Sequence, residues 1–193
     1  MIYLLPVLGY ACGSISSAVV VAQLMGLQDP REVGSKNPGA TNVLRYGGKL
    51  AAILTLVGDV VKGVIPVLIA RYFTDDPFVL ALTVLAAFVG HLFPVFFGFQ
   101  GGKGVATALG VWVALDPLIG SLLAATWLVI ALASRYSSLS SLGMSILAPV
   151  YVAWLKPDVA YVAASVAMSA LLIWRHRLNI QRLLKGEESK IGR

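Results

Sequence analysis

Long apolar stretches alternate with short polar connections along almost the whole chain. A helix that spans a bilayer needs roughly 20 mainly apolar residues, and somewhat fewer where neighbouring helices allow it. By this criterion the pattern predicts about seven spans, one of them short. We therefore expect an all-α integral membrane protein in which residues 1–193 form one transmembrane domain. The expected spans are residues 2–25, 50–72, 77–97, 105–115, 117–133, 139–155 and 159–174.

The composition supports the same class of protein. Hydrophobic residues make up 58% of the chain and charged residues only 12%, which leaves no room for a large water-soluble domain. The first stretch, MIYLLPVLGY, lacks the basic start and small-residue cleavage site of a signal peptide, so we expect it to be a retained span. The lipid bilayer is thus the expected surrounding, and we expect no nucleic-acid partner.

The basic residues lie mostly on one side of the predicted spans. Of the 15 lysines and arginines, only Arg71 and Lys156 fall in connections on the opposite side, and Lys62 lies inside a span. Because basic loops stay in the cytoplasm, we expect the N-terminus outside and the C-terminus inside the cell. The expected cytoplasmic residues are Arg31, Lys36, Arg45, Lys49, Lys103, Arg135, Arg175, Arg177, Arg182, Lys185, Lys190 and Arg193.

The first cytoplasmic connection, GSKNPGATNVLRYGG at residues 34–48, is too long and too polar for a simple turn. Its proline restricts the backbone and its glycines allow unusual dihedral angles, so its polar groups could form an oxyanion site. Alternatively, Thr41 or Asn42 caps a short interfacial helix and Arg45 extends to lipid phosphate. The candidate ligand-binding residues here are Ser35, Asn37, Thr41, Asn42 and Arg45.

The second cytoplasmic connection contains GGKG at residues 101–104, wedged between two strongly apolar runs. Consecutive glycine N–H groups can form a concave anion nest, and a helix starting near Val105 would add its positive dipole end. Lys103 would supply a full charge. A flexible turn with a lysine that reaches the membrane surface is the alternative. The short motif is not a Walker sequence and is weak evidence alone.

Other polar residues are candidates for the same site. Ser138 and Ser141 follow the fifth span, and His176 and Asn179 follow the last one with a spacing that puts them on one helical face. His91 ends the third span close to the GGKG loop. Asp59 and Lys62, at i,i+3 inside a span, can neutralise each other as a structural pair or act in a site. The basic tail after residue 176 is typical of a helix lying on anionic lipid, with Glu187 and Glu188 tying it to Arg182 and Lys185.

The motifs together resemble a known family. GSKNPGATNVLRYGG, GDVVKG, GHLFPVFFGFQGGKGVAT, RYSSLSS and RHRLNIQRLLKGEE occur in this order across nearly the whole chain, as in the bacterial acyl-phosphate:glycerol-3-phosphate acyltransferases. Lys36 stands where a glycine is common in that family, and Gln100 where a lysine is. The resemblance implies a small multi-span enzyme that transfers a fatty acyl group from acyl phosphate to glycerol 3-phosphate. The product is lysophosphatidic acid for phospholipid biosynthesis.

The chemistry fits the residues. Acyl phosphate has an apolar tail for the bilayer and a phosphate head, and glycerol 3-phosphate is a second anion, so several fixed cations are needed. We expect direct attack by the glycerol hydroxyl, with His91, His176 or a substrate phosphate oxygen as the base. No His-x-x-x-x-Asp pair, as used by coenzyme A-dependent enzymes, is found. Asn42 could stabilise the oxyanion or orient the hydroxyl.

The expected site therefore has two groups of residues. The catalytic candidates are Asn42, His91, Lys103 and His176, and the substrate-binding candidates are Ser35, Asn37, Thr41, Arg45, Gly101, Gly102, Gly104, Ser138, Ser141 and Asn179. We expect no metal and no cofactor, a monomer, and an active site on the cytoplasmic face of the bacterial inner membrane. The alternative function is a transporter or channel for an anionic, phosphate-like solute.

Overall fold

The structure is a computed structural model that describes residues 2–192, and these residues contain helices, turns and loops but no β-strand. The expectation of an all-α protein is confirmed. In chain order the helices are η1 (Ile2–Leu4), α1 (Leu5–Gly13), α2 (Ser17–Leu24), α3 (Ala40–Phe73), α4 (Pro77–Leu92), η2 (Val95–Phe97), α5 (Val105–Leu115), α6 (Pro117–Ser134), α7 (Ser137–Leu155), α8 (Val159–Arg175) and α9 (Arg177–Leu184).

Several of these helices are long and apolar enough to cross a membrane. Four pass by length and composition, namely α3, α6, α7 and the stretch Pro77–Phe97 that includes α4. Two bent pairs, α1 with α2 and α8 with α9, raise the count to as many as six, and α5 is a shorter apolar helix. Each predicted span thus corresponds to helical structure, while seven crossings stay a prediction.

The first predicted span, residues 2–25, is wrong as one continuous helix. It is broken after Gly13, and α1 and α2 meet at an angle of 42°. The break releases the carbonyl oxygen of Ile15, which accepts a hydrogen bond of 2.7 Å from Nζ of the buried Lys62. A charge inside a membrane protein needs polar partners, and the broken helix supplies one of them.

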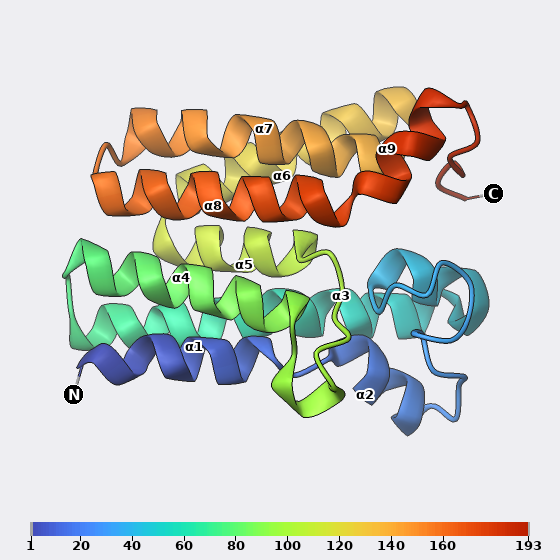
Figure 1. The fold of residues 1–193 in the computed structure, drawn as a ribbon, viewed down its shortest axis with the longest axis horizontal. Coiled ribbons are helices and arrows are strands. Elements are labelled where there is room, and N and C mark those ends of the chain that lie inside the picture. The colour runs from blue at the N-terminus through green and yellow to red at the C-terminus, as the bar shows by residue number, and fades with distance from the viewer. Residues whose placement is uncertain (1, 193) are drawn as a thin grey trace.

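The helices pack in neighbouring pairs along the long axis of the molecule (Figure 1). The main pairs are α1 with α4, α3 with α5, and α7 with both α6 and α8. Small residues allow close approach: a Cβ added to Gly13 would lie 2.0 Å from the Ala87 oxygen of α4, and one on Gly110 2.3 Å from the Val60 oxygen of α3. These glycines therefore let the helix backbones pack closely against each other.

The two ends of the bundle differ in their connections. Three turns at one end start α4, α6 and α8 with an aspartate cap: Asp76 accepts from the Phe78 N–H, Asp116 from those of Leu118 and Ile119, and Asp158 from that of Ala160. The opposite end gathers α2, the long connections before α3 and α5, and α9 with the C-terminal tail (Figure 1). The N-terminus lies at the first end and the C-terminus at the second.

Candidate active site

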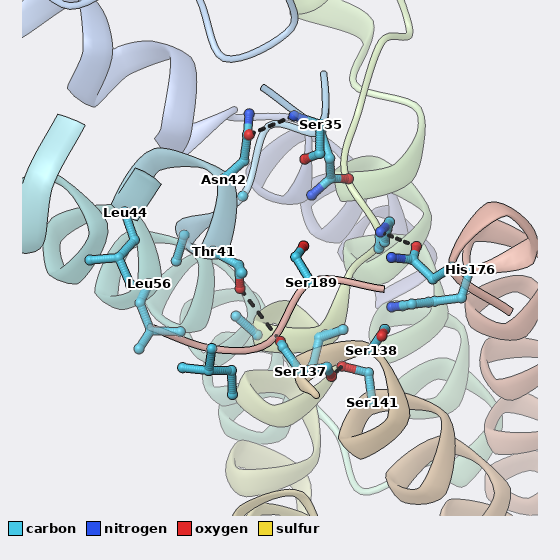
Figure 2. Close-up of a pocket in the computed structure, with 18 of the residues that line it drawn as sticks. Ser35, Thr41, Asn42, Leu44, Leu56, Ser137, Ser138, Ser141, His176 and Ser189 are labelled. Atoms are coloured by element: carbon cyan, nitrogen blue, oxygen red, sulfur yellow. Dashed lines mark hydrogen bonds between the residues drawn. The ribbon is translucent and has the colours of Figure 1, made fainter. Parts of the chain in front are cut away.

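A cavity of about 650 Å³ lies at the end of the bundle where the long connections meet (Figure 2). It is lined by the starts of α3, α5 and α7, by the junction of α8 and α9, and by the C-terminal tail. Most of the residues expected from the sequence line it together, although they are far apart in the chain. These are Ser35, Asn37, Thr41, Asn42, Arg45, His91, Lys103, Gly104, Ser138, Ser141, His176 and Asn179.

The first polar connection ends in a helix that no side chain caps. α3 begins at Ala40 after Gly39, and neither Thr41 nor Asn42 caps it, so the capping interpretation is wrong. Instead the buried Asn42 amide braces the preceding loop: its oxygen accepts from the Ser35 N–H at 2.9 Å, and its nitrogen donates to the carbonyls of Pro30 and Val33 at 3.0 and 3.1 Å. The side chain thus holds the loop, which is a different role from stabilising an oxyanion.

Backbone geometry explains one feature of this loop. Lys36 has a φ of 56°, in the left-handed region that glycine adopts most easily. Glycine is common at this position in the family that the sequence resembles. The left-handed backbone conformation is a physical reason for that preference. A short kink follows within α3 at Gly48, which has a φ of 80°.

The GGKG connection leads directly into α5. Gly104 has a φ of 86° and precedes the helix, which begins at Val105 as the sequence predicted. The first amide groups of a helix have no partners inside it, and here Gly104, Val105 and Ala106 line the cavity. Nζ of Lys103 donates to the side-chain oxygen of Asn179. Burial lowers the pKa of Lys103 to about 8. The Glu188 carboxylate raises this pKa, and nearby arginines lower it.

Gly101 and Gly102 lie behind the cavity and are not among its lining residues. Both are buried, and the Gly102 N–H donates to the His91 carbonyl at 3.2 Å. A Cβ added to Gly102 would lie 2.3 Å from Nε2 of His91, and one on Gly101 2.1 Å from the His91 oxygen. These glycines therefore allow the loop to pack tightly on α4.

His91 belongs to a buried polar group beneath the loop. Its Nδ1 lies 3.5 Å from Oδ1 of Asp59 and 3.2 Å from the Thr107 hydroxyl. Asp59 also pairs with Lys62 at 2.9 Å, so the expected ion pair within the span is confirmed. With Nδ1 in this cluster and Nε2 against Gly102, the imidazole has little freedom to reach a ligand.

His176 has a different environment, at the junction of α8 and α9. Its Nδ1 lies 2.8 Å from the Leu172 carbonyl oxygen. A carbonyl only accepts, so Nδ1 carries the proton and Nε2 of the neutral ring keeps a free lone pair. Figure 2 shows His176 and Ser141 on the same wall of the cavity. The Ser141 hydroxyl donates to the Ser137 carbonyl at 2.8 Å and accepts from the Trp127 indole at 3.2 Å.

The C-terminal tail completes the cavity wall, which the sequence did not predict. Glu188 accepts hydrogen bonds from Ser138 at 2.8 Å and Asn179 at 2.7 Å, and it pairs with Arg182 at 3.2 Å. Arg182 therefore faces the cavity rather than the lipid surface. Nη2 of Arg45 donates to the Ser189 hydroxyl at 2.6 Å. Glu188, an acidic residue within a basic tail, was the one signal in the sequence that the tail folds back onto the cavity.

One part of the cavity wall is apolar. Leu44, Leu56, Leu109 and Trp127 line it, and Leu44 and Leu56 are also 39% and 46% exposed on α3. The cavity thus joins a polar end to an apolar wall that reaches the outer surface of the bundle. Within residues 2–192, no three His, Cys, Asp or Glu side chains are grouped so as to hold a metal ion.

Comparison with known proteins gives the family. A family model described as glycerol-3-phosphate acyltransferase matches residues 3–186. Proteins of that name from Thioalkalivibrio sulfidiphilus and Halorhodospira halophila are 57% and 54% identical to this chain. The matches cover 95% of this chain and 90% of the first protein, and 98% and 96% for the second.

A solved structure agrees with these matches. The crystal structure of PlsY, an integral membrane glycerol 3-phosphate acyltransferase in its glycerol 3-phosphate form, has a TM-score of 0.94 and 45% identity, over 99% of this chain and 96% of that one. Its lysophosphatidic acid form has a TM-score of 0.91 and 43% identity, over 99% and 95%. The chain is an integral membrane protein and belongs to the glycerol-3-phosphate acyltransferase family.

Proposed function

We propose that the chain transfers a fatty acyl group from acyl phosphate to glycerol 3-phosphate, giving 1-acyl-glycerol 3-phosphate and inorganic phosphate. Family membership supports the acyltransferase activity and the glycerol 3-phosphate acceptor. One observation carries the choice of donor: a single cavity joins cations and free helix amides at one end to an apolar wall at the other. A fatty acyl phosphate has the same two parts.

The acyl phosphate head is assigned to the start of α5. The phosphate would accept from the first amides of the helix, which line the cavity at Gly104, Val105 and Ala106. Lys103 would add a charge-assisted contact, and Ser35 would approach from the facing loop. Gly101 and Gly102 shape this nest from behind. The acyl chain would follow Leu109, Trp127 and Leu56 toward the bilayer.

Glycerol 3-phosphate is assigned to the groups around the tail. Ser138, Asn179 and Arg182 already hold the Glu188 carboxylate, which supports an anion site at this place. Arg45 would pair with the substrate phosphate once it leaves Ser189. Ser141 and His176 lie on the adjoining wall, where they could bind the glycerol hydroxyls. Asn37 and Thr41 contribute the facing rim.

The reaction then needs no covalent enzyme intermediate. The glycerol hydroxyl oxygen bonds to the acyl carbon, the carbon–oxygen bond to phosphate breaks, and inorganic phosphate leaves with the electron pair. The hydroxyl proton passes to Nε2 of His176 or to a phosphate oxygen, whose pKa of about 6 suits this role. Enclosure of the His91 ring makes it the weaker base candidate. Lys103 and Arg45 neutralise the two phosphates, so no metal is required.

Location follows from the charge distribution. The sequence assigns twelve of the basic residues to the cytoplasm. Three of them, Arg45, Lys103 and Arg182, line the cavity. We place the site at the cytoplasmic face of the bacterial inner membrane, where glycerol 3-phosphate is dissolved and acyl chains are in the bilayer. All the proposed contacts with substrates come from residues of one chain, which supports a monomer as the active form.

The test supplies purified protein with fatty acyl phosphate and labelled glycerol 3-phosphate and follows the labelled lysophosphatidic acid. Parallel reactions replace the donor with acyl coenzyme A of the same chain length, or add a metal chelator. We expect product from acyl phosphate, with or without chelator, and none from acyl coenzyme A. Comparable turnover of acyl coenzyme A, or loss of activity with chelator, would contradict the proposed donor and mechanism.

A second measurement addresses transport. Protein in sealed vesicles is given labelled glycerol 3-phosphate without a donor, and uptake into the lumen is measured. Product formation with no uptake supports the acyltransferase. Uptake without any lipid product would favour the alternative of an anion transporter.

A further inference from the structure

Arg175 is the arginine at the end of α8, and it contacts the GGKG loop without lining the cavity. Its Nε donates to the Gly102 carbonyl oxygen at 2.9 Å, and its Nη2 donates to the Gly101 carbonyl oxygen. The guanidinium fork therefore binds two successive carbonyls of the loop. Two of its five N–H donors are thus bound to protein, and the side chain does not line the cavity in which a substrate phosphate would bind.

The consequence for the loop follows from peptide geometry. In a trans peptide the C=O of one residue and the N–H of the next point in opposite directions. Holding the Gly101 carbonyl on Arg175 directs the Gly102 N–H the other way, where it donates to His91. In the same way, holding the Gly102 carbonyl directs the Lys103 N–H away from Arg175, on the side where Lys103 and Gly104 line the cavity.

Glycine-rich backbone makes this restraint necessary. Glycine adopts positive and negative φ with similar ease, so a peptide in the segment Gly101–Gly102–Lys103 could turn over at little steric cost. After such a turn a carbonyl oxygen, rather than an N–H, would face an incoming phosphate and repel it. The guanidinium also contacts the rings of Phe93 and Trp174, with its central carbon 5.8 and 5.9 Å from their centres.

We propose that Arg175 is a positioning residue, which fixes the Gly101 and Gly102 carbonyls so that the loop presents the Lys103 N–H, rather than a carbonyl oxygen, to the phosphate of the acyl donor. This inference rests on the proposed function, because it assumes that the loop binds the acyl phosphate head. It assigns Arg175 no contact with substrate. The residue acts through the backbone of the loop and through Lys103.

The test compares Arg175→Met with Arg177→Met. Arg177 is exposed, carries the same charge two residues later and contacts Trp174, so the control removes an equal charge near the same ring. Misplacing a catalytic element by about 1 Å can cost about 100-fold. We expect Arg175→Met to lower kcat/KM for acyl phosphate by about 10- to 100-fold, and to change KM for glycerol 3-phosphate by less than about twofold. Arg177→Met should keep wild-type kinetics.

Arg175→Lys separates positioning from simple charge. Lysine keeps the positive charge but lacks the fixed fork that bridges two carbonyls. We expect it to recover only part of the loss in kcat/KM for acyl phosphate. Full recovery by lysine, or equal losses from Arg175→Met and Arg177→Met, would overturn the proposal because charge alone would then explain the effect.

Hydrogen exchange supplies a readout that does not depend on activity. In wild-type and Arg175→Met protein of similar thermal stability, deuterium uptake is followed for residues 100–106. We expect faster uptake there in Arg175→Met and Arg175→Lys, with no change in the turn at residues 74–77. Unchanged uptake in residues 100–106 would overturn the positioning role. If wild-type protein made no product from acyl phosphate, the proposed function would fail while this measurement still tested the restraint.

Discussion

The two ends of the bundle are built from the same kind of helix but differ in how the chain turns. At one end, short turns lead into α4, α6 and α8. Each of these helices follows an aspartate whose side chain accepts a hydrogen bond from an amide in the first turn of the helix. At the other end, α5 begins at Val105 directly after Gly104, and no side chain caps this start. The first kind of start binds one or two of its amides to its own aspartate, whereas the second has no side-chain acceptor and lies at the cavity.

The charges follow the same division. Asp76, Asp116 and Asp158 dominate the short turns, and the cavity end carries Arg45, Lys103 and Arg182. An aspartate cap satisfies a helix dipole locally and needs no ligand. A helix start that is left open and surrounded by cations is suited to an external anion. The proposed site therefore lies at the end of the bundle where a helix start has no local side-chain acceptor.

The largest expected effect concerns the sides of the membrane on which the two ends lie. The test uses protein in which Cys12, the single cysteine of the sequence, is replaced by serine. New single cysteines then replace Lys36 or Gly186 at the cavity end, and Asp75 or Pro157 at the short-turn end. All four positions are exposed. We expect an impermeant thiol reagent to label the first pair only from the cytoplasmic side and the second pair only from outside. Labelling of the Lys36 and Gly186 positions from opposite sides would contradict the seven-span prediction, which places six crossings between these two residues.

Loss of a cation should have the next largest effect, and only at the cavity end. Arg45→Ala and Lys103→Ala each remove a charge-assisted contact of roughly 1.5–3 kcal/mol, so we expect kcat/KM to fall by about one to two decades. Lys156 provides the matched control, because its Nζ lies 4.0 Å from Oδ2 of Asp116 at the other end of the bundle. Lys156→Ala should change kcat/KM by less than about twofold. Normal kinetics in both cavity variants would show that these cations contact lipid rather than substrate.

The pH dependence sharpens the role of Lys103. Burial lowers its pKa to about 8, so the free protein loses this charge as the pH rises through that value. Because kcat/KM reports the free enzyme, we expect it to fall on the alkaline side with an apparent pKa of about 8, and to level off at about the one- to two-decade loss expected for Lys103→Ala. Arginine stays charged, so Lys103→Arg should move this limb to higher pH. An unchanged alkaline limb in Lys103→Arg would assign the titration to another group.

The smallest expected effect is on stability at the short-turn end. Asp116→Ala removes the acceptor for the Leu118 and Ile119 amides and should lower the free energy of unfolding by about 1 kcal/mol. Asp116→Asn retains a capping oxygen and should lose less. Thermal unfolding measures both variants, and kcat/KM per folded molecule should stay at the wild-type value. A large loss of kcat/KM in folded Asp116→Ala would show that this end takes part in the reaction.

Several features of the protein followed from the sequence alone. Apolar stretches of a given length have few alternatives to membrane helices, so the helical class and most helix positions were predicted correctly. The start of α5 near Val105 and the Asp59–Lys62 pair were predicted because each depends on residues close together in the chain. The motifs also indicated the family, since their order covers nearly the whole chain.

Only the tertiary structure decided which polar residues meet and what each one contacts. The Ile15 carbonyl that is free at the break after Gly13 is bound by Lys62 of another helix. Asn42 spends its amide on loop carbonyls, and Glu188 returns to the cavity from the tail. Gly101 and Gly102 lie behind the cavity, and their carbonyls accept hydrogen bonds from Arg175. Helix formation is governed by neighbours in the chain, whereas these contacts join residues tens of positions apart, and only packing of the whole bundle selects among them.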